Sequence, residues 1–328
     1  MKKKLSAKQK KDAIFIYGFL AWPILHFVVF WIGMNFRTFY DSFFDISIVE
    51  GAGVVYKWDN FDNYIRVFKI IFNKAPYDNY DLAGIINYRA VTNSLSLIPL
   101  ALFINMPLTI LFAYGIFKKG PMYGFFRIAL FLPSLVSSVV LCMCFQMAID
   151  INRGILPEIL RWFGLTGARG DPANMGIIPQ GGFLADPKTC WPMILVFSVI
   201  NGVSGNLIYF TSTMARLPAS VFESAELDGA SSLRQFVSIV VPMIWPTITT
   251  MTVTLVAGVF TWIMPSLLMT DGGQWYSTTI GLMITQVVKN DMYNTVMSAF
   301  GVIVAIFGTI IIVSIKTGME KLFEGVEY

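Results

Sequence analysis

Six long apolar runs constrain what this chain can fold into. None of them contains Asp, Glu, Lys or Arg. They cover approximately residues 13–35, 91–117, 128–148, 191–213, 242–269 and 293–315. About 20 apolar residues let a helix cross the ~30 Å hydrocarbon core of a bilayer, and only helices or closed barrels satisfy their backbone polar groups there. The runs predict an all-α, polytopic membrane protein with six transmembrane helices.

The composition leaves little room for a separate soluble domain. Of the 328 residues, 55% are hydrophobic and 13% are charged, against about 25% charged residues in soluble domains. The net charge of +4 is modest and predicts no nucleic-acid partner. We therefore expect one membrane domain over residues 13–315, between a basic tail at 1–12 and a C-terminal tail at 316–328.

The basic residues predict the orientation of the spans. Thirteen of the 24 fall in short segments on one side of the predicted membrane. The six lysines of residues 1–12 are joined there by Lys118, Lys119, Arg127, Arg216, Arg234, Lys316 and Lys321. Short loops rich in Lys and Arg stay in the cytoplasm. Both termini and the loop at about 214–241 are thus predicted to be cytoplasmic, in a multi-pass protein.

A polar, helix-favouring segment interrupts the apolar pattern between the fourth and fifth runs. It reads Glu223-Ser-Ala-Glu-Leu-Asp-Gly-Ala-Ser-Ser. Its acidic residues, Glu223, Glu226 and Asp228, lie two or three positions apart on a predicted helix. Gly229 permits a helix stop or a close backbone contact. The segment is typical of a charged surface element that docks into another protein.

This segment resembles the E-A-A-x-x-D-G-A…F-x-x-I-x-L-P loop in the membrane-spanning subunits of binding-protein-dependent ABC importers. The matching residues are Glu223, Ala225, Asp228, Gly229, Ala230, Phe236, Ile239 and Pro242. Ser224 replaces the first alanine of the pattern, and Val241 replaces its leucine. The resemblance implies that the helix around Glu223–Ser232 sits in a cleft of an ATPase subunit. Glu223 would hold that contact electrostatically, and Pro242 with Pro246 would fix how the fifth span enters the membrane.

Further motifs extend the resemblance from about residue 13 to the C-terminus. Phe126-Arg-Ile-Ala-Leu-Phe-Leu-Pro133 is similar to the F-R-x-x-x-F-L-P that opens the third span of sugar-type permeases. Thr270-Asp-Gly-Gly273 is similar to their T-x-G-G-P, with Gln274 in place of proline. These motifs resemble the maltose- and glycerol-phosphate-type permeases. Within that group the chain looks like a subunit that pairs with a different, related permease.

Two long segments fall on the predicted external side. In residues 36–90, Ser42-Phe-Phe-Asp45 and Phe61-Asp-Asn-Tyr64 resemble the family's S-F-x-D and x-x-N-Y segments. In residues 149–190, apolar side chains recur at helical spacing and predict a short surface helix; they are Ile155, Leu156, Ile159, Leu160 and Phe163. Each segment is either a docking surface for a solute-binding protein or a cover over the outer ends of the spans.

Small and hydroxylated residues form stripes on three of the runs. On the third, Ser134 and Ser138 are one turn apart. The fourth carries Ser198, Asn201, Gly202 and Gly205 on one helical face. The fifth carries Thr247, Thr254, Gly258, Thr261 and Pro265, with Trp262 beside them. Such stripes pack helices together or line a cavity, and both interpretations stay open.

The resemblance places substrate-facing positions on the third, fourth and fifth spans. The matching residues are Ser134, Ser138, Ser198, Asn201, Gly202, Gly205 and Trp262. Trp262 would stack on the apolar face of a sugar ring, while Asn201 and the serines would bond its hydroxyls. Met264 and Pro265 depart from the family pattern in the fifth span.

Catalytic and nucleotide-binding motifs are missing from the sequence. No G-x-x-x-x-G-K-[ST] occurs. His26 is the single histidine, and Cys142, Cys144 and Cys190 show no metal-site spacing. We expect no catalytic residues, no metal and no cofactor on this chain, with ATP and Mg held by partner subunits. The implied partners are a second permease, two ATP-binding subunits and an extracellular solute-binding protein.

The sequence therefore predicts the permease subunit of an ATP-driven importer of a carbohydrate. One alternative substrate is a phosphorylated polyol such as glycerol phosphate. A phosphate favours Arg or Lys at its site, and the runs contain neither, so a neutral sugar or oligosaccharide is favoured. From another class, an ion-coupled carrier would show an intramembrane acid or inverted repeats, and neither is seen.

Overall fold

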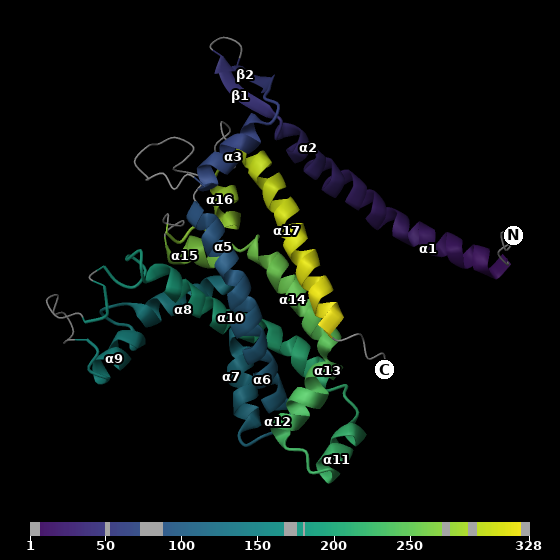
Figure 1. Cartoon of the computed structure of the whole chain (residues 1–328), viewed down its shortest axis with the longest axis vertical. Helices are drawn as coiled ribbons and strands as arrows, with labels where there is room; N and C mark the ends of the chain where they lie inside the picture. Colours follow the sequence, from purple (N-terminus) through teal and green to yellow (C-terminus); the bar gives the residue numbers. More distant parts are fainter. Residues whose placement is uncertain are drawn as a thin grey trace. The chain divides into compact units, whose positions relative to one another are not determined.

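The chain folds into two compact units. A computed structural model describes residues 7–49, 53–72, 88–166, 176–179, 181–270, 276–287 and 294–322. One unit comprises Met1–Lys69 and Val287–Ala305, and the other comprises Ile70–Gln286 and Ile306–Tyr328 (Figure 1). The predicted basic tail is described only from residue 7, and the C-terminal tail only to residue 322.

The first unit begins with one long helix. It comprises α1 (Ala7–His26), a π-helical stretch (Phe27–Ile32) and α2 (Gly33–Asp41). Lys11–Asp41 is long and apolar enough to cross a membrane. Aromatic side chains along it, such as Trp22 and Phe30, are exposed. The helix is longer at both ends than the predicted run at 13–35.

A β-hairpin follows this helix, so the all-α prediction is wrong at this point. Strand β1 (Phe44–Val49) pairs antiparallel with β2 (Gly53–Trp58), and Phe44 lies opposite Trp58. The segment Phe44-Asp-Ile-Ser-Ile48 alternates apolar and polar residues, and β2 is rich in Val and aromatic residues. Alternation and β-branched side chains favour a strand over a helix.

The hairpin is joined to α3 (Asp62–Phe72) by buried polar contacts. Asn63 Nδ2 donates to the backbone oxygens of Phe44, at 2.7 Å, and of Ser42, at 3.2 Å. The Ser42 and Tyr64 hydroxyls lie 2.7 Å apart. The two motifs that the sequence places at residues 42–45 and 61–64 are therefore in direct contact.

The second unit is helical throughout its described residues, apart from turns and loops. Its elements are α5 (Tyr88–Leu100), a π-helical stretch (Ala101–Asn105), α6 (Met106–Phe117), α7 (Tyr123–Leu135), α8 (Ser138–Ile149), α9 (Ile155–Trp162), α10 (Cys190–Met214), α11 (Ala219–Leu227), α12 (Ser232–Gln235), a second π-helical stretch (Phe236–Val240), α13 (Val241–Met243), α14 (Trp245–Val259), α15 (Met264–Met269) and α16 (Ile280–Val287). The chain ends in α17 (Asn294–Leu322), whose residues from Ile306 onward belong to this unit.

Four to six helices of the described residues are long and apolar enough to span a membrane. Lys11–Asp41, Tyr88–Phe117, Cys190–Met214 and Thr295–Leu322 qualify on their own. Two further candidates are pairs of helices with a sharp bend: α7 and α8 meet at 110°, and the helical segment Ser232–Met243 meets α14 at 71°. The protein is thus mostly helical with several membrane-length helices.

The predicted third and fifth runs are not single helices. In the third, Val136 and Ser137 are extended, with ψ of 143° and 138°, and separate α7 from α8. Pro133 lacks a backbone donor and lies just before this break. In the fifth, α14 ends at Val259 and α15 starts at Met264. The runs at 128–148 and 242–269 are therefore interrupted helices, and the structure accounts for the six predicted spans only if each bent pair is counted as one span.

Polar side chains of α5 bind the non-helical backbone of residues 276–279, just before α16. Asn93 Nδ2 donates to the backbone oxygens of Tyr276, at 3.1 Å, and of Thr278, at 3.0 Å. Ser94 Oγ accepts a bond of 2.9 Å from the Ile280 amide. Non-helical backbone within a membrane domain requires such partners. The predicted T-x-G-G motif falls mostly at 271–273, outside the described residues; Thr270 is buried and its hydroxyl lies 2.8 Å from that of Ser277.

The predicted helix in the segment at 149–190 is confirmed as α9. Leu156 and Leu160 pack against a buried cluster of Ile149, Ile178 and Phe183. Ile155, Ile159 and Phe163 are exposed on the other face. The helix therefore covers part of its own unit and leaves a second apolar face uncovered.

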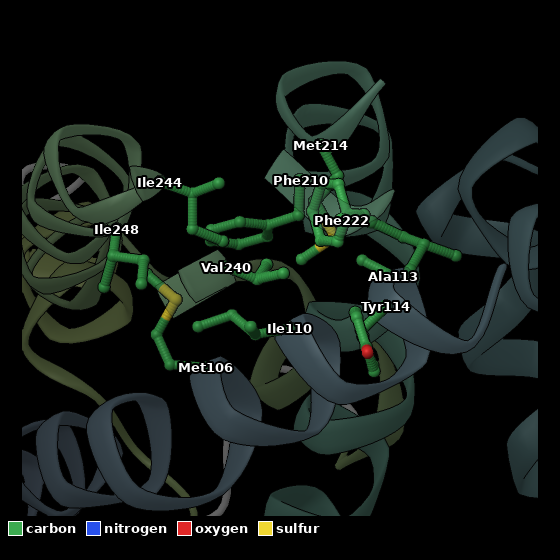
Figure 2. Close-up of a cluster of buried hydrophobic side chains, with 11 residues drawn as sticks. Met106, Ile110, Ala113, Tyr114, Phe210, Met214, Phe222, Val240, Ile244 and Ile248 are labelled. Atoms are coloured by element: carbon green, nitrogen blue, oxygen red, sulfur yellow. The ribbon is translucent and has the colours of Figure 1, made fainter. Parts of the chain in front are cut away.

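A core cluster joins α6 and α10 to the segment between α10 and α14. It contains Met106, Ile110, Ala113, Tyr114, Leu207, Phe210, Met214, Phe222, Val240, Ile244 and Ile248. Figure 2 shows Phe210 and Val240 between side chains of the surrounding helices, with Phe222 near Ala113. These apolar contacts fix α11, through Phe222, and the π-helical stretch after α12, through Val240, against α6 and α10.

Candidate functional site

The acidic segment singled out in the sequence forms a short helix with a closed C-terminus. Helix α11 ends at Leu227, and Gly229 has a φ of +72°. The Gly229 amide donates to the Glu226 oxygen at 3.0 Å, and the Ala230 amide donates to the Ala225 oxygen at 2.9 Å. These two bonds make a Schellman motif, in which the left-handed residue is usually glycine. The helix stop predicted at Gly229 is confirmed.

The extent of this helix differs from the prediction. It begins at Ala219 and ends at Leu227, so the helix expected around Glu223–Ser232 is wrong at both ends. Residues 228–231 form the turn, and Ser231 then caps α12 by accepting from the Arg234 amide at 3.4 Å. Pro218 immediately precedes α11 and, with an extended ψ of 127°, sets its start.

Phe222 holds α11 against the rest of the unit. Its side chain is 7% exposed and packs 5.2 Å from the Phe117 ring, between ring centroids. Lys118 Nζ lies 3.0 Å from Glu226 Oε1 and 5.5 Å from the centre of the Phe222 ring. One apolar and one charged contact therefore tie α11 to the end of α6.

The segment after the turn is tied to the same helix. Tyr114 OH donates to the Ser232 oxygen at 2.9 Å. Gln235 is 2% exposed, and its Nε2 donates to the Ala230 oxygen at 2.9 Å. Pro242 is half-buried within the three-residue α13, near the 71° bend into α14. A movement of α11 would thus be transmitted to α6 and, through α12, toward α14.

The exposed surface of α11 is both acidic and apolar. Glu223 and Asp228 are exposed, and neither forms an ion pair within the described part of the chain. Leu227 is 89% exposed. Beside Gly229 no atom lies within 4 Å of the position that a Cβ would take. This surface offers a partner two free carboxylates, an apolar side chain and an open backbone turn.

Several residues of this site were not predicted from the sequence. They are Phe222, Leu227, Lys118, Tyr114 and Gln235. Phe222 could have been predicted to be buried, because it is a large apolar residue next to the polar segment, at the position before Glu223. The contacts of Lys118 and Tyr114 join residues more than 100 positions apart, which no local pattern reveals.

The predicted stripe on α10 divides into packed and open positions. Ser198 is buried and donates to the Ile194 oxygen of its own helix at 2.8 Å. A Cβ at Gly202 would lie 2.7 Å from Asn105 Nδ2, so Gly202 is a close packing contact with the helix before α6. Asn201 is half-buried, and Gly205 is exposed with open space beside it.

The break between α7 and α8 separates the two serines of the third run. Ser134 lies on α7, exposed, and donates to the Phe131 oxygen at 2.7 Å. Ser138 is the first residue of α8 and is also exposed. They are not one turn apart on a helix, because α7 and α8 meet at 110°. The predicted spacing is wrong for this pair.

Thr261 and Trp262 lie in the irregular segment after α14. Thr261 is exposed, and its hydroxyl donates to the Gly258 oxygen at 3.2 Å. Trp262 is half-buried and meets Trp191 edge to face, with ring centroids 6.3 Å apart. Trp191 Nε1 donates to Ser96 Oγ at 3.0 Å. The predicted stripe along the fifth run therefore ends at α14, and Trp262 belongs to an aromatic pair that the sequence did not indicate.

These features define a multi-helix protein in which an exposed, acidic helix and turn (residues 219–231) lie between two membrane-length elements. Residues 98–324 match the model of a known protein family, the binding-protein-dependent transport system inner membrane components. The chain belongs to this family. It is accordingly a multi-pass membrane component of a transport system. The match begins at residue 98, so the first membrane-length helix and the hairpin lie outside it.

Several of the relatives are named as sugar-uptake permeases. The diacetylchitobiose uptake system permease protein of Streptomyces coelicolor is 24% identical over 235 residues, which are 70% of this chain and 60% of that protein. The arabinooligosaccharides transport system permease protein of Bacillus subtilis is 24% identical over 59% of this chain and 62% of its own length. The chain thus aligns with about three fifths of these relatives.

Solved structures share the fold over nearly the whole chain. A bacterial ABC transporter involved in the import of the acidic polysaccharide alginate matches with a TM-score of 0.71 and 19% identity. The match covers 96% of this chain and 98% of that chain. A second structure of the alginate transporter, in complex with an alginate pentasaccharide-bound periplasmic protein, also has a TM-score of 0.71.

Proposed function

We propose that this chain is the permease subunit of an ATP-driven ABC importer that takes up a sugar or oligosaccharide. The observation that carries the proposal is the α11 turn, in which Gly229 closes the helix and Glu223 is left free. Family membership and the sugar permeases among the relatives support it. In this proposal six spans cross the membrane, both termini are cytoplasmic, and residues 13–315 form the permease domain.

Three kinds of partner follow from this proposal. An extracellular solute-binding protein delivers the sugar, as the complex of the structural neighbour with a periplasmic protein suggests. A second, related permease completes the pathway. Two ATP-binding subunits hold ATP and Mg, and this chain catalyses no reaction of its own.

The contacts of α11 give this proposal its mechanism. Glu223, Asp228 and Leu227 face the ATP-binding subunit, while Phe222 and the Lys118–Glu226 ion pair hold α11 to α6. Closure of the ATP-binding subunits moves α11 as a rigid lever, since its turn is fixed by backbone hydrogen bonds. The movement reaches α6 and α14 and alternates access to the pathway, as in other transporters that rock rigid bundles.

The sugar pathway is proposed along the open positions of the predicted stripes. Asn201 and Gly205 on α10, Ser134 on α7 and Ser138 on α8 are at least partly exposed in this chain. Trp262 presents an aromatic ring of the kind that stacks on sugar rings. Gly202 is assigned to packing, because Asn105 occupies the space beside it.

A phosphorylated polyol is the second candidate substrate. The sn-glycerol-3-phosphate transport system permease protein of Agrobacterium fabrum is 26% identical over 44% of this chain. A phosphate ligand favours Arg or Lys, and the proposed pathway positions carry neither. A neutral sugar therefore remains favoured.

Reconstitution tests the proposal. The chain, co-expressed with its second permease and ATP-binding subunits and placed in proteoliposomes, should accumulate labelled oligosaccharides only with ATP and loaded binding protein. Parallel vesicles with glycerol 3-phosphate test the second candidate. ATP hydrolysis by the isolated chain, or uptake without ATP-binding subunits, would contradict the proposal.

A further inference from the structure

A groove of about 840 Å³ lies between α7, α10 and the end of α6. Its volume is within the ~300–1,000 Å³ of typical ligand sites. The groove is amphipathic. At one end are Lys119, Tyr123 and Arg127, and toward the other are Leu132, Leu135 and Ile208.

The change from polar to apolar lining follows the order of the lining residues along α7 and α10. Along α7, Tyr123 and Arg127 precede Leu132 and Leu135, while along α10 Ile208 precedes Ala215. Polar and basic side chains therefore gather at the end of the groove near the α6–α7 turn. Apolar side chains line the part that runs along the helices, with Leu132 and Leu135 exposed.

The two basic side chains are uncompensated. Neither Lys119 nor Arg127 forms an ion pair with any residue that the structure describes, and both are exposed. Lys118, by contrast, pairs with Glu226. Lys119 has a φ of +49°, a left-handed conformation that is uncommon outside glycine. The adjacent lysines thus serve different surfaces, one contacting α11 and the other lining the groove.

A second groove on the α6–α7 hairpin provides a contrast. It has a volume of about 260 Å³ and is lined by residues such as Leu111, Phe112 and Phe126. No charged residue is among its described lining residues. The larger groove therefore differs from the smaller one, because it combines basic side chains that form no ion pair with an apolar wall.

We propose that the larger groove is a binding site for an anionic phospholipid of the inner leaflet. Lys119 and Arg127 bind its phosphate, Tyr123 donates a further hydrogen bond, and an acyl chain lies along Leu132, Leu135 and Ile208. Basic pockets between helices at the cytoplasmic side bind lipid headgroups in this way. A free phosphate would find nothing to bind on the apolar wall. The inference rests on the proposed orientation, which places the α6–α7 turn in the cytoplasm.

The lipid would also affect the docking segment. Its phosphate would restrain Lys119, next to the Lys118–Glu226 pair that holds α11. An anionic bilayer should therefore stabilise the attachment of α11, in addition to occupying the groove.

Native mass spectrometry of the assembled complex tests the site. The complex is purified from nanodiscs containing equal amounts of phosphatidylglycerol and phosphatidylcholine, and the retained lipids are counted. The wild type should retain phosphatidylglycerol selectively. Lys119→Gln with Arg127→Gln should lower that preference about 30-fold, which is about fivefold for each basic residue. Ile208→Trp should displace the lipid while keeping both charges.

A matched control removes the same charge elsewhere. Lys11→Gln with Lys321→Gln changes two exposed basic residues outside the groove and should leave the preference unchanged. An unchanged preference in Lys119→Gln with Arg127→Gln would overturn the proposal. So would loss of the second permease from that variant with lipid retention unaltered, because the groove would then be a subunit contact. Selective retention in a complex that imports no sugar would refute the proposed function and leave the lipid site standing.

Discussion

Glu223 and Glu226 lie three residues apart on α11 but differ in what they already contact. Glu226 is paired with Lys118, whereas Glu223 has no ion-pair partner in the described part of the chain. A partner protein can therefore gain a full ionic contact from Glu223 without breaking one inside this chain. In the same way, Phe222 is buried and already packed inside this chain, whereas Leu227 is exposed and can contact a partner.

Two substitutions at Gly229 separate the effect of backbone strain in this chain from a steric clash with a docked partner. Gly229→Val should cost about 1–2 kcal/mol, because a β-branched residue is strained at a φ of +72°. Gly229→Asn should cost less, since Asn tolerates this conformation. Both add a side chain where a partner backbone would approach. Thermal melting should distinguish the two variants; if sugar-stimulated ATP hydrolysis falls only in the strained one, close approach at Gly229 is not required.

Phe222 and Leu227 form a second matched pair. Phe222→Ala should destabilise the attachment of α11 by up to about 3–5 kcal/mol, because it empties a packed core position. Leu227→Ala should leave the melting temperature unchanged, since its side chain touches little in this chain. It should instead weaken the recovery of the ATP-binding subunits in a pull-down. A normal pull-down for Leu227→Ala would remove it from the docking surface.

The proposed pathway is tested at Asn201 and Trp262. Loss of one hydrogen bond to a sugar hydroxyl is worth about 0.5–1.5 kcal/mol, and loss of the Trp262 ring removes a large apolar contact. Asn201→Ala and Trp262→Ala should each lower uptake several-fold at limiting sugar, and less at saturating sugar. A role in packing predicts a lower melting temperature with unchanged uptake per assembled complex. Transport and melting are measured on the same preparations.

At the scale of elements, Gly202 and Gly205 show how one stripe serves two purposes. Gly202→Ala would place a Cβ 2.7 Å from Asn105 Nδ2, so the buried Asn105 side chain must give way or α10 must shift. We expect a lower melting temperature and less assembled complex. Gly205→Ala has open space and should melt like the wild type. Equal melting temperatures for the two variants would contradict the close packing at Gly202.

The sequence predicts a helix correctly where a long apolar run forms one uninterrupted helix, as in α10 and α17. It fails where single residues break the helix, because the length of a run does not reveal that Val136 and Ser137 adopt an extended backbone. The hairpin was missed since the weak alternation at Phe44–Val49 lies in a segment interpreted as a loop. The α11 turn was predictable because glycine has a specific conformational role. Its contacts to Lys118 and Tyr114 depend on tertiary packing, which the sequence does not display.

At the scale of the whole molecule, the chain carries three surfaces whose polar or charged groups find no partner in its described residues. The α11 segment has free carboxylates and no nucleotide motif beside it. The positions Asn201 and Gly205 on α10 are at least partly exposed, and the α7–α10 groove carries cations without an ion-pair partner in the described residues. In the proposed function, each surface meets a different partner: an ATP-binding subunit, a second permease and the lipid of the bilayer. A permease subunit of a larger importer accounts for all three.

Sugar uptake per assembled complex is the measurement that tests the central claim most directly. Wild-type complex, Glu223→Lys and the control Glu320→Lys are compared in proteoliposomes with ATP and loaded binding protein. Glu320→Lys reverses an exposed charge near the end of α17, outside α11, where Glu320 pairs only with Lys316, at 3.8 Å, among the ion pairs of the described residues, and should transport like the wild type. Glu223→Lys should abolish uptake while the chain remains folded in the membrane, because it sets a positive charge against the surface that binds the carboxylate. Wild-type uptake by Glu223→Lys in a fully assembled complex would contradict the account.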